Sequence, residues 1–280
     1  MGIDRNHCII GETEHPFTIN FSRDDVRITT HYHADMVASS LYSVVHEGGH
    51  ALYELHTGRE LARSNLGNGV SMGIHESQSR FYENIIGRSR AFCSVIYPWL
   101  KEHFAPRLDN VTEDDFYRMI NKSEPSLIRT EADELTYCLH IMVRYELEKR
   151  MFDGTLTAHD LPAEWNRLYK EYLGIDVPND RQGVLQDSHW ANGNIGYFPS
   201  YAIGSAYGAQ YLKEMSGDLD VDAVVRSGDL TPINSWLEEK IWKYGCMKDP
   251  VALFESVCGK FDPDCYVAYL EKKFTEVYGL

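Results

Sequence analysis

The chain has 280 residues, and 27 Lys and Arg against 42 Asp and Glu give it a formal net charge of −15. An acidic surplus of this size disfavours binding to the phosphates of nucleic acids. Hydrophobic residues make up 43% of the sequence and charged residues 25%, which is typical of globular domains. No apolar run reaches the roughly 18 residues that a membrane-spanning helix needs. We therefore expect neither nucleic acid nor membrane as a partner.

The N-terminus and the cysteines suggest a compartment. Residues 1–6 carry no apolar stretch after a basic start, so we expect no secretory signal. The six cysteines have no C-x-x-C spacing, and in a chain of this size they are expected to be reduced thiols. The expected location is cytoplasmic.

Helical patterns dominate the chain. Strand-like alternation is confined to residues 17–30 and predicts one β-hairpin. Apolar residues at the helical period, followed by Gly58, predict the first long helix over residues 35–56. Thr112 and Asp115 form a capping-box pattern that starts another helix. Further helices are expected at 75–103, 126–151, 161–173, 200–216, 232–244 and 263–278. The expected fold class is mainly α, with a small hairpin or sheet, in a single domain over residues 1–280.

Two segments interrupt the helical rhythm. Residues 64–71 hold two glycines, and residues 182–199 are rich in polar and aromatic groups. Loops of such composition on a rigid helical frame are where binding groups usually lie. We expect both loops to contribute to a site.

Residues 46–50 read H-E-G-G-H on the first predicted helix. Side chains four residues apart share one face of a helix, so the imidazoles of His46 and His50 can bind one metal ion. Glu47 can then reach a water activated by that metal. The glycines at 48 and 49 lower helix propensity by about 1.5–2 kcal/mol relative to alanine, a cost that a purely structural helix has little reason to carry. The pattern therefore predicts a metal site rather than a chance arrangement of two histidines.

A third ligand must come from elsewhere in the chain. His56 follows His46 by ten residues, but no glycine turns the chain at Tyr53, and an unbroken helix would carry His56 about 15 Å along the axis. Glu76, at the start of the next predicted helix, is the stronger candidate. Three other glutamates remain possible on spacing alone: Glu54, Glu60 and Glu83.

Several motifs occur in the same order as in a known family. They are HPF at 15–17, DxRxT at 25–29, HEGGHALYE at 46–54, HESQSRFYEN at 75–84, IRxxAD at 128–133 and GxxQDxHW at 183–190. In these the chain resembles the M32 metallocarboxypeptidases. The resemblance implies a helical, zincin-like metallopeptidase fold with a small sheet near the active site. It also implies a divalent metal, expected to be zinc with cobalt as the alternative, held by His46, His50 and Glu76.

The resemblance further implies an activity, the removal of single residues from peptide C-termini, with Glu47 as the general base. A free α-carboxylate is suited to the planar fork of an arginine, and Arg129 in the IRxxAD match is the candidate, with a helix ion pair as the alternative role. His189 and Tyr201 are candidate donors to the developing oxyanion, and a core role for each is equally open. His75, beside Glu76, could contact a metal ligand without binding the metal itself.

Members of this family are usually close to twice as long as this chain. The motifs match only their C-terminal half, so we expect the N-terminal half of the family fold to be absent. The substrate groove would then be completed by self-association, as in a homodimer, or by a separate chain. Two other functions compete: an endopeptidase or aminopeptidase on the same H-E-x-x-H site, and an inactive or binding half-subunit that needs a partner chain.

Overall fold

The computed structural model describes residues 1–280, which fold as two compact units. The first unit combines residues 1–120 with residues 204–280, and the second consists of residues 121–203. The first unit is discontinuous in sequence and the second is continuous, and the single domain expected over 1–280 stays a prediction. None of the helices has the length and apolar character needed to cross a membrane.

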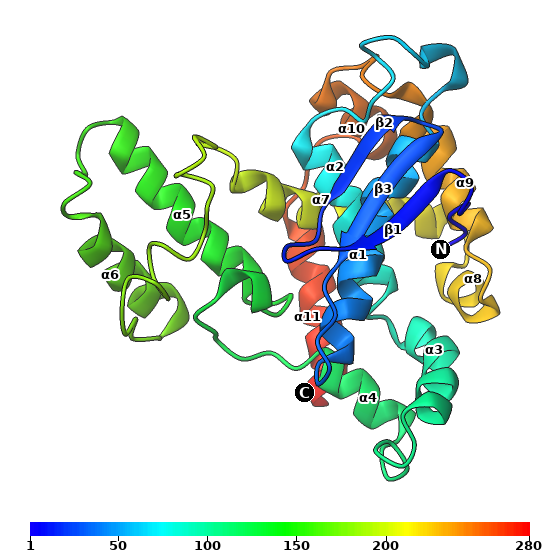
Figure 1. Ribbon diagram of the computed structural model, residues 1–280, viewed down its shortest axis with the longest axis horizontal. Helices are drawn as coiled ribbons and strands as arrows, with labels where there is room; N and C mark the ends of the chain where they lie inside the picture. Colours follow the sequence, from blue (N-terminus) through cyan, green and yellow to red (C-terminus); the bar gives the residue numbers. More distant parts are fainter. The chain divides into compact units, whose positions relative to one another are not determined.

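The elements follow one another as a short sheet and then helices (Figure 1). The strands are β1 (Cys8–Glu12), β2 (Thr18–Ser22) and β3 (Asp25–Thr30). The helices of the first unit are α1 (Val37–Leu55), α2 (Met72–Arg80), α3 (Arg90–His103), α4 (Glu113–Ile120), α8 (Val221–Ser227), α9 (Thr231–Lys240), α10 (Pro250–Cys258) and α11 (Asp264–Tyr278). The second unit holds α5 (Tyr137–Phe152) and α6 (Leu161–Leu173), and α7 (Pro199–Asp218) starts in it and continues into the first. The mainly α prediction with a small sheet is confirmed.

The sheet has the strand order β1-β3-β2 and lies against α1 (Figure 1). The predicted hairpin is the antiparallel pair β2 and β3, while β1, which the sequence did not reveal, pairs parallel to β3. Val26 and Ile28 of β3 are buried with Ala51 and Leu55 of α1. Alternating residues of one strand thereby fasten the sheet to the helix that carries the H-E-x-x-H motif.

Other boundaries correct the sequence predictions. The helix expected at 75–103 is interrupted: α2 passes into a π-helical turn at Phe81–Ile86, and α3 begins anew where the Ser89 hydroxyl accepts a hydrogen bond from the Phe92 N–H. The helix expected at 126–151 begins only at Tyr137, and in the turn before it the carboxylate of Asp133 accepts hydrogen bonds from the backbone N–H groups of residues 135 and 136, as at the start of a helix. Two short helices, α8 and α10, were not predicted.

The two glycines of the motif do different things. A Cβ on Gly49 would lie 2.6 Å from the carbonyl oxygen of Gln78 and 2.6 Å from the Cα of Ser79, so the missing side chain lets α1 and α2 approach backbone to backbone. A Cβ on Gly48 would meet only the flexible ends of two side chains, Met1 at 2.8 Å and Ile3 at 3.3 Å. Only one of the two glycines is therefore required by helix packing.

We expect Gly49→Ala to lower the free energy of unfolding by about 1–3 kcal/mol, because the added methyl group meets backbone atoms that cannot move aside. Gly48→Ala should leave it unchanged or raise it by up to about 1 kcal/mol, because alanine favours a helix and the Met1 side chain can shift. Urea denaturation of both variants measures the difference. Equal effects would show that α1 and α2 do not depend on their close approach.

The core of the second unit forms where α5 and α6 pack together. Val143 and Leu147 of α5 lie with Trp165, Leu168 and Tyr169 of α6 in one buried cluster. His140, on the same helix as Val143, is fully buried, with its Nδ1 3.1 Å from the Tyr169 hydroxyl. Burial, with the nearby guanidinium groups of two arginines, lowers the pKa of His140 from 6.5 to about 3. This imidazole is therefore neutral in the folded protein at neutral pH.

Because its folded pKa lies below its unfolded pKa, His140 contributes stability that is present above pH 6.5 and is lost as the pH falls toward 3. Because of this one residue, we expect the free energy of unfolding to be about 2 kcal/mol lower at pH 5 than at pH 7. His140→Gln should reduce the fall in the free energy of unfolding between pH 7 and pH 5 by about that amount. His159→Gln, whose imidazole is exposed, is the control. Identical pH profiles for wild type and His140→Gln would contradict the burial argument.

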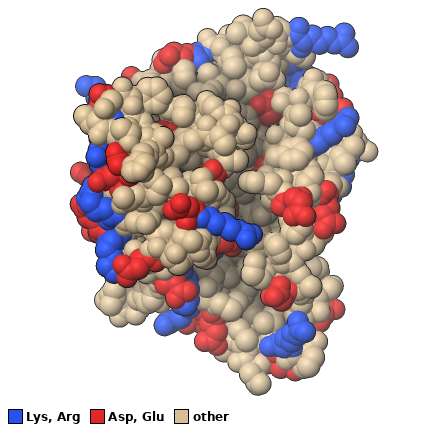
Figure 2. Space-filling view, turned by 60° about the vertical axis from the view of Figure 1, so that its left-hand side comes forward, with Lys and Arg blue, Asp and Glu red and all other residues tan.

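Charged side chains of both signs are interspersed on the face that Figure 2 draws, without a continuous basic area. This agrees with the net charge of −15. The surface in view offers no track of cations for a phosphate backbone.

Candidate metal centre

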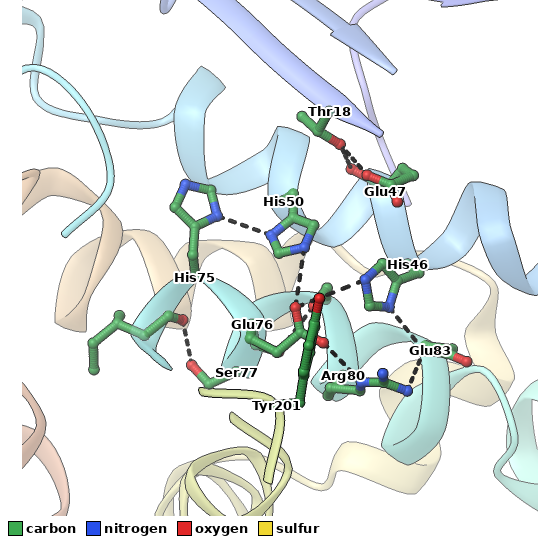
Figure 3. A network of polar contacts seen from close by, with 12 residues as sticks. Thr18, His46, Glu47, His50, His75, Glu76, Ser77, Arg80, Glu83 and Tyr201 are labelled. Carbon is green, nitrogen blue, oxygen red and sulfur yellow. Dashed lines mark hydrogen bonds and ion pairs between the residues drawn. The ribbon is translucent and has the colours of Figure 1, made fainter. Parts of the chain in front are cut away.

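His46 and His50 lie one turn apart on α1, and Glu76 lies on α2, the helix that Gly49 allows to approach (Figure 3). One ligand atom from each of the three lies within 4.8 Å of the others. The Glu76 Oε2 is 3.4 Å from the His50 Nε2 and 3.9 Å from the His46 Nε2. The structure brings together the three residues that the sequence predicted as ligands.

These spacings fit a metal ion better than direct hydrogen bonds. Zinc binds imidazole nitrogen and carboxylate oxygen at about 2.0–2.2 Å, so two ligands of a tetrahedral site stand on the order of 3.3 Å apart. The distances of 3.4 and 3.9 Å are near this value, and the longer one exceeds a hydrogen bond. Two imidazoles and one carboxylate are also the donor set of catalytic zinc sites, which keep a fourth position open. The residues present therefore fit a divalent metal.

The far nitrogen of each histidine is occupied. His46 Nδ1 lies 2.8 Å from the Glu83 carboxylate, and His50 Nδ1 lies 2.9 Å from His75 Nδ1 (Figure 3). A hydrogen bond at Nδ1 turns the ring and leaves Nε2 facing Glu76. Glu83, a possible ligand on spacing alone, instead contacts the Nδ1 of the candidate ligand His46.

Two arginines balance the carboxylates of the centre. The Arg80 Nε donates to Glu76 Oε1 at 2.9 Å, and its Nη1 donates to Glu83 Oε2 at 3.2 Å. The Arg88 guanidinium stands 3.7 Å from the other oxygen of Glu83. Neither arginine was predicted, although Arg80 lies four residues after Glu76, a spacing that places both side chains on one face of a helix.

Burial and charge pull the pKa values in opposite directions. Burial alone would raise the pKa of Glu76, but His46, His50 and Arg80 hold it well below its usual range. Burial likewise opposes ionisation of Glu83, yet mainly Arg80 and His46 lower its pKa to about 2. Burial would lower the pKa of His46, and the two carboxylates raise it instead to about 8. Both carboxylates are therefore anionic, which suits a divalent cation.

Glu47, the predicted general base, is buried at 7% exposure on α1 between the two histidines in sequence. Its carboxylate accepts a hydrogen bond from the Thr18 hydroxyl of β2, which also lies 3.1 Å from the Glu47 backbone carbonyl (Figure 3). The sheet thus holds the side chain of Glu47 in one orientation. Thr18 carried no motif, so the sequence offered no sign of this contact.

The other candidate ligands are elsewhere. His56 Nδ1 donates to the Leu52 carbonyl at 2.8 Å, and its ring packs on Trp242, which agrees with the expectation that it is not a ligand. Glu54 binds His75 instead of approaching the three ligand atoms, and Glu60 is exposed.

The predicted substrate residues meet in the second unit. Arg129 is buried at 5% exposure, and its guanidinium donates to Asp187 Oδ1 through Nε and Nη2 and to the Tyr137 hydroxyl through Nη1. Its Cζ stands 4.8 Å over the ring of Tyr201, whose hydroxyl is 3.0 Å from His189 Nε2. The structure therefore joins Arg129, His189 and Tyr201 in one cluster. The anchor Asp187 lies in the GxxQDxHW match but was not assigned a role.

The two loops singled out in the sequence both contribute contacts. In the loop at 64–71, the Gly69 N–H donates a hydrogen bond to the Glu54 carboxylate at 3.0 Å. The loop at 182–199 supplies Asp187 and His189 to the cluster of the second unit. Each loop therefore contributes polar groups that contact other parts of the same unit, and its role in binding stays a prediction.

Two histidines four apart, a glutamate between them and a carboxylate from the following helix form the arrangement of metal-dependent peptidases. The family described as "Carboxypeptidase Taq (M32) metallopeptidase" matches residues 1–274. The chain belongs to this M32 family, and the family description implies a divalent metal.

Relatives of this family agree with the match. The chain is 43% identical over 280 residues to "Carboxypeptidase 1" of Bacillus subtilis, which covers 99% of the chain and 56% of that protein. It is 44% identical over 262 residues to "Thermostable carboxypeptidase 1" of Pyrococcus furiosus, with 93% and 52% covered. The chain thus spans about half the length of the curated relatives that it matches.

Solved structures show the same fold. An M32 carboxypeptidase from Deinococcus radiodurans superposes with a TM-score of 0.97 at 39% identity, covering 100% of this chain and 57% of that one. The structure titled "Structure of Pyrococcus furiosus Carboxypeptidase Apo-Mg" gives a TM-score of 0.94 at 42% identity, covering 96% and 55%. The helical zincin-like fold class is confirmed.

We expect Glu76→Gln to weaken zinc binding at least about 100-fold, because it removes an anionic ligand between two imidazoles. Zinc at 1,000 times its Kd should also raise the free energy of unfolding of the wild-type protein by about 4 kcal/mol, and with it the melting temperature, and a chelator should reverse this. Competition with a chromophoric chelator measures the affinity. Glu60→Gln, at an exposed glutamate, is the control; a Glu76→Gln protein that binds zinc as the control does would exclude Glu76 as a ligand.

Proposed function

We propose that this chain carries the catalytic centre of a metal-dependent carboxypeptidase that removes single amino acids from peptide C-termini. The convergence of His46, His50 and Glu76 on one point is the observation that carries the proposal. The names of the relatives, carboxypeptidases from Bacillus subtilis and Pyrococcus furiosus, support the choice of substrate end.

When bound, a divalent metal lowers the pKa of water and polarises a carbonyl group. We propose zinc as that metal, with cobalt as an alternative, because imidazole and carboxylate ligands suit both. Glu47 then serves as the general base: its carboxylate accepts a proton from the attacking water and passes it to the leaving amine. The Thr18 hydroxyl orients the carboxylate for this transfer.

In the proposed reaction the cluster of the second unit binds the peptide. Arg129 has five N–H donors, and three hydrogen bonds to Asp187 and Tyr137 fix the plane of its guanidinium. Such a preoriented guanidinium can bind the free α-carboxylate of a peptide with its remaining N–H groups. His189 and Tyr201, joined by a hydrogen bond, supply the donors for the developing oxyanion.

Glu47→Gln should keep zinc affinity within a few-fold and lower kcat by about 10²–10⁴, because the amide cannot accept a proton. Steady-state cleavage of a blocked dipeptide, with metal content measured on the same sample, tests both halves. A mutant with wild-type turnover would remove Glu47 from the mechanism.

Arg129→Met should raise KM for peptides with a free carboxylate and leave C-terminally amidated peptides unaffected. Asp187 keeps a second cation in this variant, since Arg144 Nη2 is 2.5 Å from its other oxygen, so the buried carboxylate is not left unpaired. Equal losses on both substrates would mean that Arg129 supports the fold and does not bind substrate.

Digestion of a peptide by the zinc-loaded protein, followed by mass spectrometry, tests the function as a whole. A ladder of single-residue losses from the free C-terminus, absent for the matched C-terminal amide, is the expected result. Internal cleavage would indicate an endopeptidase, and losses from the N-terminus an aminopeptidase. No cleavage by protein with bound zinc would indicate a binding half-subunit.

We also propose that a second polypeptide, another copy of the chain in a homodimer or a separate protein, completes the substrate groove. The support is that the chain spans about half the length of its relatives. Light scattering alongside the activity assay tests this, and a fully active monomer would contradict it. A cytoplasmic location is proposed because all six cysteines are free thiols.

A further inference from the structure

We propose that His75 and Glu54 act as a positioning pair that sets the tautomer and the ring orientation of His50. The inference rests on the metal centre of the proposed function, and it concerns residues that do not bind the metal themselves. It assigns a role to a chain of contacts that runs from α1 to α2 and back to α1.

Two consecutive contacts join His50 to His75 and His75 to Glu54. His50 Nδ1 lies 2.9 Å from His75 Nδ1, and His75 Nε2 lies 2.6 Å from Glu54 Oε1 (Figure 3 shows the first of these). Glu54 follows His50 by four residues on α1, so these two residues lie on the same face of one helix. His75, adjacent to the ligand Glu76, stands between them.

Only one placement of protons satisfies both hydrogen bonds, His50 to His75 and His75 to Glu54, when a metal is bound. A metal on His50 Nε2 requires a lone pair there, so the single proton of the neutral ring must sit on Nδ1. That N–H then donates to His75 Nδ1, which must offer a lone pair. The proton of His75 therefore sits on Nε2 and donates to the Glu54 carboxylate, which can only accept. The carboxylate thus selects one tautomer in each ring.

Glu54 is itself held in place. It is 5% exposed, and its Oε1 also accepts from the Gly69 N–H at 3.0 Å, while its Oε2 accepts from Asn20 Nδ2 at 2.8 Å. A Cβ on Gly69 would lie 2.7 Å from His75 Nε2, so a glycine at this position lets the loop close over the ring. Three segments of the first unit thereby converge on one carboxylate.

The two ligand histidines are supported differently. His46 donates directly to Glu83, a carboxylate shared with Arg80. His50 reaches its carboxylate only through the ring of His75. Removal of the His75 ring therefore takes away the only hydrogen-bond acceptor that the structure shows for His50 Nδ1, while the support of His46 is untouched.

The test compares His75→Leu with His75→Asn in the full chain. The two side chains have nearly the same shape, but asparagine keeps an oxygen that can accept from His50 Nδ1 and leucine does not. We expect His75→Leu to weaken zinc binding 10- to 100-fold and His75→Asn to restore it to within a few-fold of wild type. Competition with a chromophoric chelator gives the affinities.

A second readout is independent of metal. Long-range ¹H–¹⁵N spectra of histidine-labelled, metal-free protein report which ring nitrogen of His50 carries the proton. Wild type and His75→Asn should show it on Nδ1, and His75→Leu should shift it toward Nε2. Tyr82→Phe is the control for lost stability alone, because it removes a half-buried hydrogen bond to Asn234 that does not touch the ligands.

Equal zinc affinity in both His75 variants, or an unchanged His50 tautomer in His75→Leu, would overturn the proposal. An equal loss of zinc affinity in Tyr82→Phe would do so too, because it would trace the effect to general destabilisation. If wild type binds zinc but cleaves no peptide, the proposed function fails while the affinity ratios still decide the role of His75. If wild type binds no zinc at these residues, both fail.

Discussion

The close approach of α1 and α2 at Gly49 is the contact on which the metal centre depends. Without a side chain at that position, two helix backbones meet, and Glu76 comes within 3.4 Å of the His50 Nε2. The sheet then packs on α1 through Val26 and Ile28 and brings Thr18 to Glu47. The missing Cβ at Gly49 and the packing of the sheet on α1 thus bring groups from three segments to the candidate metal centre.

Because the centre is buried, each of its charged side chains needs a partner of opposite charge. Glu76 and Glu83 stay ionised although they are buried, because arginine and histidine lie within hydrogen-bond reach. Buried charges are stable only when they are paired or bind a metal, and here both kinds of partner meet. The same low-dielectric surroundings strengthen every interaction that orients His46 and His50. The arginines are therefore part of the site, because they pair with its carboxylates.

The chemistry of the site was largely readable from short spacings. The candidate ligands His46 and His50 follow from helical periodicity, and the candidate Glu76 follows from its position at the start of the next helix. The partners Thr18, Arg80 and Asp187 escaped because single residues without a motif carry no sign of where the chain will bring them. The same limit applies to β1, whose parallel pairing with β3 is a tertiary contact.

Sequence alone determined that the chain is mainly helical, that His46 and His50 share one face of a helix and that the family is M32. These depend on local periodicity, in which neighbours on one helix face are neighbours in the sequence pattern. The tertiary structure decided how α2 ends in a π-helical turn, why Gly49 is required and Gly48 is not, and which group lies behind each ligand. Those features depend on atoms that approach from distant segments, and close packing, which no local pattern records, settles them.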